Sequence, residues 1–178
     1  MTPVPASRLI AATLGLLTVI WTVGWLAREP VTAFSTAVLA HGGIPGLFAL
    51  VVLTDPLPGI GFQGALFVGW TGGLHPFVIW AVVFAGSLSG SALTWAVGRG
   101  ARRPLAGLLE RYGVAAVLRK QRWRAVALAS VTPLPFGVAT LGAGAVGLTL
   151  RETMAGAIVR GLKIGVILSV IALGWGER

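Results

Sequence analysis

Cysteine is absent from this 178-residue chain, and the only histidines are His41 and His75. Without cysteine the chain can form no disulfide, no thiolate metal site and no cysteine nucleophile. Two isolated histidines are too few for a metal cluster of their own. We therefore expect neither a metal nor any other cofactor.

Charged residues are also scarce, at 11% of the chain, whereas hydrophobic residues make up 56% and the mean hydropathy is +0.88. A soluble domain carries about 25% charged residues. The composition therefore predicts an integral membrane protein, and its long apolar runs predict an all-α one. The 14 Lys and Arg exceed the 5 Asp and Glu. In a membrane protein this excess marks cytoplasmic loops and lipid phosphates rather than nucleic acid.

The first long apolar run covers residues 9–27 and is flanked by Arg8 and Arg28. Its length suits a membrane-spanning helix, so we predict a first span there. The alternative is a cleaved signal peptide that ends near residues 38–40, but the run is long for one and charges intervene before that site. A second span is predicted over residues 76–97.

Residues 31–75, between these spans, are apolar overall but are broken by glycines and prolines, most densely at Asp55, Pro56 and Pro58. Proline removes a backbone donor and clashes with the preceding turn, so this cluster ends one helix and starts another. Backbone groups freed at membrane depth must be satisfied by protein or by trapped water. We therefore predict a re-entrant helix-loop-helix over this region. Asp55 also suits the N-cap of the returning half-helix.

Residues 98–124 carry eight basic residues against Glu110 alone. The positive-inside rule places such a segment in the cytoplasm. Its apolar residues recur at helical spacing, which favours an amphipathic helix on the bilayer surface over a solvated charged linker. These apolar residues are Leu105, Leu108, Leu109 and Tyr112.

The proline break of the first half returns in the second half. Pro133-Leu134-Pro135 follows Pro56-Leu57-Pro58 by 77 positions. Gly142-Ala143 follows Gly64-Ala65 by 78 positions, so one inserted residue reconciles the two matches. Chance similarity between apolar, glycine-rich segments is the alternative, but the shared tripeptide favours a true repeat.

Each break is followed by a glycine-rich apolar segment and then by a span, over 76–97 in the first half and over 152–175 in the second. If residues 98–124 are cytoplasmic, the first re-entrant region enters the membrane from outside and the N-terminus is cytoplasmic. The second re-entrant region, over residues 125–150, then enters from the cytoplasm. Secondary transporters have such inverted repeats, with breaks that meet near the midplane. We thus predict a single all-α membrane domain with an inverted repeat, two re-entrant hairpins and about three full spans. The alternative is a kinked full crossing over 124–150.

Arg160 and Lys163 lie deep within the last predicted span. If that helix begins at Arg151, they are about 13 and 18 Å along its axis at 1.5 Å per residue. Charges at such depth are costly and normally face a cavity or a partner, and a spacing of three puts both on one face. We predict that they draw a lipid phosphate toward a cavity near Asp55. In the alternative, both side chains snorkel to the cytoplasmic interface.

The chain contains, in this order, a spanning helix, a proline-broken acidic segment, the stretch GSLSGSALTWAVGR, a basic linker and the stretch VTPLPFGVATLGAGAVG. This order resembles the DedA/VTT superfamily of SNARE-associated membrane proteins. The resemblance covers nearly the whole chain from about residue 30. The resemblance implies a protein that moves phospholipid or polyprenyl-phosphate lipid between leaflets, in some members with coupling to protons or other ions. The compact chain without long loops favours a bacterial cytoplasmic membrane, and a homo-oligomer is compatible with it.

The chain departs from the family pattern at the second break. Members usually carry an arginine three residues before the first proline, where this chain has Ser130, and the bacterial branch carries another where this chain has Phe136. Asp55 represents the acid of the first break. The substrate or ion path that the resemblance and the charges imply consists of Asp55, Pro56, Pro58, Ser130, Pro133, Pro135, Arg160 and Lys163.

Two further functions remain open. An ion-coupled transporter of a small solute would pair the same charges in a closed aqueous site, and a membrane scaffold or assembly factor would need the prolines only for structure. An enzyme is not expected, because no histidine or paired carboxylate stands at a usable spacing from Ser87, Ser89 or Ser91 to activate a nucleophile. No RNA-binding motif points to a nucleic-acid partner.

Overall fold

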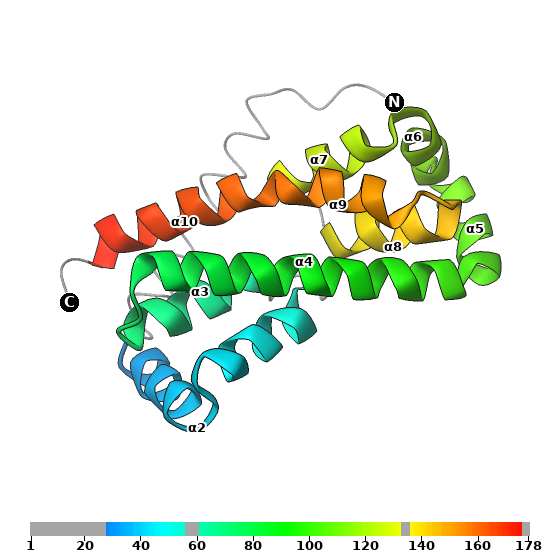
Figure 1. Ribbon diagram of the computed structural model, residues 1–178. Helices are drawn as coiled ribbons and strands as arrows, with labels where there is room; N and C mark the ends of the chain where they lie inside the picture. Colours follow the sequence, from blue (N-terminus) through cyan, green and yellow to red (C-terminus); the bar gives the residue numbers. More distant parts are fainter. Residues whose placement is uncertain (1–27, 56–60, 133–135, 176–178) are drawn as a thin grey trace.

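The computed structural model describes residues 28–55, 61–132 and 136–175. All of these residues lie in helices or in short turns, and none of them forms a β-strand, which confirms the all-α prediction for this part of the chain. The helices, labelled as in Figure 1, are α2 (Arg28–Thr54), α3 (Gly61–Thr71), α4 (Pro76–Gly100), α5 (Arg102–Arg111), α6 (Val114–Gln121), α7 (Trp123–Val131), α8 (Phe136–Val146), α9 (Leu150–Ile158) and α10 (Arg160–Trp175).

Some of these helical stretches are long and apolar enough to cross a membrane, which supports the prediction of a membrane protein. They are Ser35–Thr54, Pro76–Gly100 and Leu150–Gly174. The last two match the spans predicted over 76–97 and 152–175. The first lies inside the region that the sequence predicts to be re-entrant. The span predicted over 9–27 falls outside the described residues.

Helix α2 consists of two helical pieces that meet at a kink (Figure 1). Gly43 lies at the kink with φ 54° and ψ −154°, far from helical values, and Pro45 follows inside the next turn. Proline cannot donate a backbone hydrogen bond, and glycine tolerates the positive φ that other residues avoid. Ser35–Thr54 is therefore not one straight helix.

Two long helical stretches, α4 and the consecutive pair α9 and α10, lie side by side and run in opposite directions (Figure 1). Two tryptophans of α4 bond to α10 and to the turn just before α9. The indole N–H of Trp80 donates to the Gly161 carbonyl at 3.0 Å, and the indole N–H of Trp95 donates to the Leu148 carbonyl at 2.9 Å. Because the earlier tryptophan contacts the later partner, these bonds fix an antiparallel register.

The apolar core is divided into two clusters. One packs α2 and α3 against the first half of α4 and against α10, and the other packs α5 to α8 against α9 and the second half of α4. Along α4 the change of cluster falls between Phe84 and Leu88, and along α9 and α10 it falls between Ala157 and Ile164. Ser87 and Arg160 occupy these two intervals, so buried polar groups lie where the apolar clusters meet.

The two eleven-residue helices α3 and α8 end in the same way. Gly73 and Gly147 follow them with φ of 80° and 88°. In each turn the next residue is a leucine, whose amide donates to the carbonyl five positions earlier, at 3.1 and 2.9 Å. This is a Schellman ending, which needs a glycine with positive φ. A side-chain cap from His75 or Thr149 then starts the following long helix.

These bounds correct the predicted register of the second half. Helix α8 begins 75 positions after α3, and Gly147 lies 74 positions after Gly73. The pairing of Gly64 with Gly142 is therefore wrong, because Gly64 is the fourth residue of α3 and Gly142 is the seventh residue of α8. Small residues are frequent throughout tightly packed membrane helices, so a shared Gly-Ala pair carries little information about position.

The basic linker forms two helices and not the predicted single amphipathic helix. Helix α5 ends at Arg111, Gly113 turns the chain with φ of 70°, and α6 follows. Leu109 is buried and packs on α8, whereas Leu108 and Tyr112 of the predicted stripe are 52% and 72% exposed. Leu105, Leu108 and Leu109 lie in α5 and Tyr112 is its C-cap, so the turn at Gly113 shortens the predicted helix without separating these four residues. Whether this helix pair lies on the bilayer surface stays a prediction.

Trp80→Phe is expected to lower the free energy of unfolding by about 1–2 kcal/mol. Phenylalanine keeps a ring beside Phe84, whose centroid is 5.2 Å from that of Trp80, but it loses the hydrogen bond to Gly161. Thermal unfolding in detergent micelles measures the change. The matched control is Trp123→Phe, at a residue that is 44% exposed. Equal losses for both variants would contradict a role for the indole bond.

Candidate functional site

A buried ion pair joins the end of α2 to the start of α10. Nη2 of Arg160 donates to Oδ1 of Asp55 at 2.5 Å, and the Ser87 hydroxyl of α4 donates to Oδ2 at 2.8 Å. The side chains of Arg160 and Asp55 are 7% and 2% exposed. Three elements far apart in sequence thus meet at one carboxylate. Since an unpaired charge is costly to bury, each charge of the pair depends on the other.

The local backbone places Arg160 at this point. Helix α9 ends at Ile158, and Val159 joins it to α10 through a tighter turn in which the Leu162 amide donates to the Val159 carbonyl at 3.2 Å. The long helical stretch is therefore irregular directly before Arg160. Such local changes of helix geometry are frequent at functional sites.

Two phenylalanines contact the guanidinium of Arg160. Its Cζ lies 4.7 Å from the ring centroid of Phe62 and 4.2 Å from that of Phe136, within the range of cation–π contacts. Phe62 is the second residue of α3 and Phe136 is the first residue of α8. The helices that follow the two breaks, α3 and α8, therefore both contact Arg160 through a phenylalanine at their start.

Part of the Arg160 guanidinium has no hydrogen-bond acceptor. Within the described part of the chain, its Nε and Nη1 are buried without a partner. Nearly all buried donors in folded proteins are hydrogen-bonded, to protein or to water. The Arg160 guanidinium can therefore donate hydrogen bonds to a further acceptor, in addition to attracting one by its charge.

Lys163 lies one turn further along α10 and contacts the other break. Its ammonium donates to the carbonyl of Thr132 at 2.9 Å, and Thr132 is the C-cap of α7. Carbonyls at a helix C-terminus carry partial negative charge and attract cations. One face of α10 thus places a cation at the residue before each proline break, Asp55 in one case and Thr132 in the other.

The remaining predicted path residues are placed as follows. The buried Ser130 hydroxyl donates to the carbonyls of Val126 and Gly156, at 2.9 and 3.1 Å, and so ties α7 to α9. Its bonds reach neither the ion pair nor Lys163, and they describe a packing role. Pro56, Pro58, Pro133 and Pro135 lie outside the described residues.

Sequence reasoning missed two contributors to the site. Ser87 was visible only as one hydroxyl among several in GSLSGSALT, and nothing in the pattern linked it to an acid 32 positions earlier. Phe62 gave no signal, because an apolar residue in an apolar helix has no distinguishing feature. Phe136 stood out only as a departure from the family pattern.

The ionic groups of the site carry one negative and two positive charges, a net charge of +1 from Asp55, Arg160 and Lys163. In the low dielectric of a protein interior such an excess attracts an anion strongly. The described residues contain no cluster of three or more metal-ligating side chains. The arrangement is suited to binding an anion.

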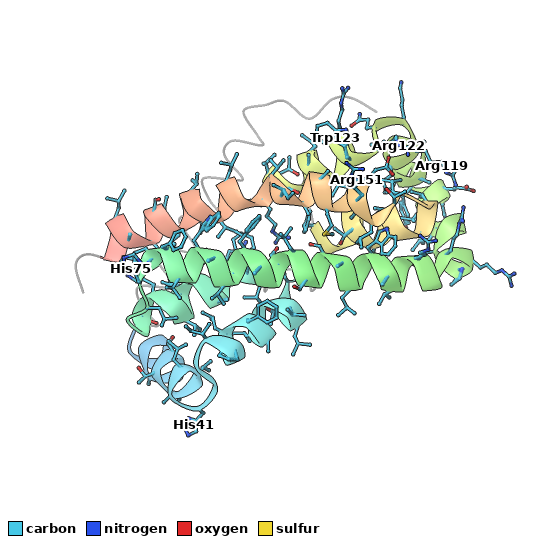
Figure 2. All side chains as sticks on the ribbon, in the orientation of Figure 1. His41, His75, Arg119, Arg122, Trp123 and Arg151 are labelled. Carbon is cyan, nitrogen blue, oxygen red and sulfur yellow. The ribbon has the colours of Figure 1, made fainter. Side chains whose placement is uncertain are left out.

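A second ion pair lies at the junction of α6, α7 and α9. Arg122, the one described non-glycine residue with positive φ (51°), donates to Oε1 of Glu152 at 2.5 Å, and Glu152 also closes the capping box of Thr149. The hydrogen bond and then the charge of Glu152 raise the pKa of Arg122. Figure 2 shows Arg122 near Arg119 and Arg151 at one end of the molecule, away from the labelled histidines. The pair attaches the basic linker to α9.

Comparisons with protein-family models, with curated proteins and with solved structures found no match. The likeness to the DedA/VTT superfamily therefore stays a prediction from the sequence, and the function has to be argued from the site.

Proposed function

We propose that this protein is a membrane transporter that moves phospholipid or polyprenyl-phosphate lipid between leaflets. The observation that supports this most is that Arg160 and Lys163, on one helix, contact the residues directly before the two breaks. A movement at either break changes the partners of a cation on α10. A transport site needs such a link, because binding has to alter the segments that open it to either side.

In this proposal α2–α3 and α7–α8 are re-entrant hairpins of an inverted repeat in a bacterial cytoplasmic membrane. Helices α3 and α8 have 11 residues each and share one type of ending. A helix of this length extends about 16 Å and reaches only halfway through a hydrocarbon core of about 30 Å. The arginines gathered at one end of the molecule favour a cytoplasmic position for that end (Figure 2).

A phosphate headgroup suits this site for chemical reasons. Arginine binds phosphate through directed N–H donors, and lysine adds a compact point charge. Both are present within one helical turn, with a net positive charge around them. Holding them at membrane depth is costly, and such residues usually mark a pathway for substrate or ions.

A transporter of a small solute is the second candidate, with coupling to protons or other ions. The observation that favours it is the tight pairing of Asp55 with Arg160, whose side chains are 2% and 7% exposed. A closed, paired site needs no groove for acyl chains. A scaffold or assembly factor would have no use for a buried arginine with unmatched donors, and an enzyme would need an activated nucleophile that the site does not supply.

Leaflet exchange of fluorescent phospholipids and polyprenyl phosphates in reconstituted vesicles tests the proposal. Wild-type protein is expected to accelerate exchange, and the double variant Arg160→Gln, Lys163→Gln is expected to lower the rate at least about tenfold, the effect of 1.4 kcal/mol in a barrier. Removing both cations removes the attraction for the headgroup. Asp55→Asn is expected to lower the rate as well, because Arg160 loses its counter-ion.

The matched control is Ser169→Ala. Ser169 is exposed on the same helix, and its hydroxyl donates to the Gly165 carbonyl of that helix. Its exchange rate is expected to equal that of the wild type. If folded wild-type protein exchanges neither lipid class, the lipid proposal is wrong, and uptake of small anions into the same vesicles then separates a solute transporter from a scaffold.

A further inference from the structure

We infer that Asp55 is an internal anion that occupies Arg160 until a phosphate group of the ligand displaces it. The inference rests on the proposed transport function and deepens it, because it names the chemistry recognised at the site and the residue that has to leave. The ion pair Arg160–Asp55 is then the resting state of a binding site and not a fixed structural link.

The first step is that Arg160 is only partly used. One nitrogen, Nη2, donates to Asp55, whereas Nε and Nη1 have no acceptor among the described residues although the side chain is 7% exposed. A guanidinium carries N–H donors on all three nitrogens and has no acceptor of its own. A structural pair in a well-satisfied core would match these donors, so the unmatched ones point to a ligand with more oxygens than one carboxylate offers.

The second step is that the guanidinium is held by elements other than the one that carries Asp55. Phe62 belongs to α3 and Phe136 belongs to α8, and both rings contact the cation without using its N–H groups. Asp55 instead follows the last residue of α2. The carboxylate can therefore leave while Arg160 keeps its position and its two aromatic contacts.

The third step is the charge that the ligand meets. With Asp55 in place, its carboxylate neutralises one of the two cations of α10. Once Asp55 has moved away, Arg160 and Lys163 both face the incoming group, and a phosphate with two negative charges balances them.

Binding of inorganic phosphate to the purified full chain in detergent tests this inference, with isothermal titration calorimetry at constant ionic strength and chloride as the control anion. Asp55→Asn is expected to bind phosphate at least about tenfold more tightly than the wild type, because the internal anion no longer occupies Arg160 and the apparent Kd falls as the competent fraction rises. Arg160→Gln is expected to abolish the binding. If Asp55→Asn binds phosphate no more tightly than the wild type, the inference is wrong.

A second variant covers the case in which Asp55→Asn does not fold. Ser87→Ala keeps both charges and removes only the hydroxyl that holds Oδ2 of Asp55. It loosens the internal anion, so phosphate affinity is expected to rise about two- to threefold, whereas a purely structural pair would leave the affinity unchanged. Ser169→Ala is again the control, and its affinity is expected to match that of the wild type.

Two sources of phosphate are separated by repeating the titration in nanodiscs. Phosphatidic acid in the disc is expected to compete with inorganic phosphate if the headgroup is the ligand, and to have no effect if the ligand is a free anion. The result also separates this inference from the transport function. If the protein exchanges lipid but Asp55→Asn does not bind phosphate more tightly, only the inference about Asp55 is rejected. If Asp55→Asn binds phosphate more tightly but the protein exchanges no lipid, only the lipid proposal is rejected.

Discussion

Asp55→Leu is expected to lower the free energy of unfolding by about 3–5 kcal/mol, because the substitution leaves the Arg160 guanidinium buried without its counter-ion. The double variant Asp55→Leu, Arg160→Met is expected to recover to within about 1 kcal/mol of the wild type, because an apolar pair of similar size needs no desolvated charge. The surroundings suit such a pair, since Phe62 and Phe136 already contact Arg160. Asp55→Asn should cost less than Asp55→Leu, because its amide oxygen still accepts a hydrogen bond.

Reversible unfolding in mixed micelles measures these three variants. The informative quantity is the coupling energy of the cycle formed by Asp55→Leu, Arg160→Met and the double variant. A strong coupling, with the double variant close to the wild type, is the expected result. Additive losses would mean that the two residues act independently, and the pair would then not be the link between α2 and α10.

The same double variant separates stability from function. A buried salt bridge is weak support for stability, since an apolar replacement is often as good. If the double variant folds as well as the wild type but no longer exchanges lipid or binds phosphate, the charges are retained for transport. This outcome is expected, because the unmatched donors of Arg160 add nothing to the stability of the closed state.

The helix breaks and the long helices could be predicted from local chemistry. Pro76 starts α4 as predicted, because proline at the first turn costs no hydrogen bond. Helix α2 ends at Thr54 and α7 ends at Val131, each shortly before a proline pair. These features depend on neighbouring residues, and so they are readable without a structure.

The contacts between distant segments could be predicted only in part. The depth of Arg160 predicts that it needs a partner, and Asp55 is the acid nearest to a break, so their proximity follows from the cost of isolated charge. The hydroxyl of Ser87 and the ring of Phe62 could not be assigned, because apolar and small polar residues fill many equivalent places in membrane helices. The two-helix linker was also missed, since the helical spacing of its leucines outweighed the single glycine at 113.

Gly144→Ala is expected to lower the free energy of unfolding by about 3 kcal/mol, the upper end of the usual cost of overpacking. A methyl group there would lie 2.1 Å from the carbonyl oxygen of Trp95 and 2.8 Å from the amide nitrogen of Arg99. Both are backbone atoms of α4, so neither can rotate away. Gly98 faces the same crossing from α4, where a methyl group would lie 2.0 Å from the Leu141 oxygen.

Gly64→Ala is the matched control, because Gly64 lies inside the other eleven-residue helix and a methyl group there meets nothing within 4 Å. This substitution is expected to be neutral or to stabilise by up to about 1 kcal/mol, since alanine favours the helix. Equal melting temperatures for the two variants would show that α4 and α8 can separate freely. The substitution Gly144→Ala is also expected to affect the phosphate site. Helix α8 begins at Phe136, and the distance between α8 and α4 sets where the Phe136 ring meets Arg160. Phosphate affinity should therefore fall in Gly144→Ala at temperatures where it remains folded, while Gly64→Ala keeps the wild-type value.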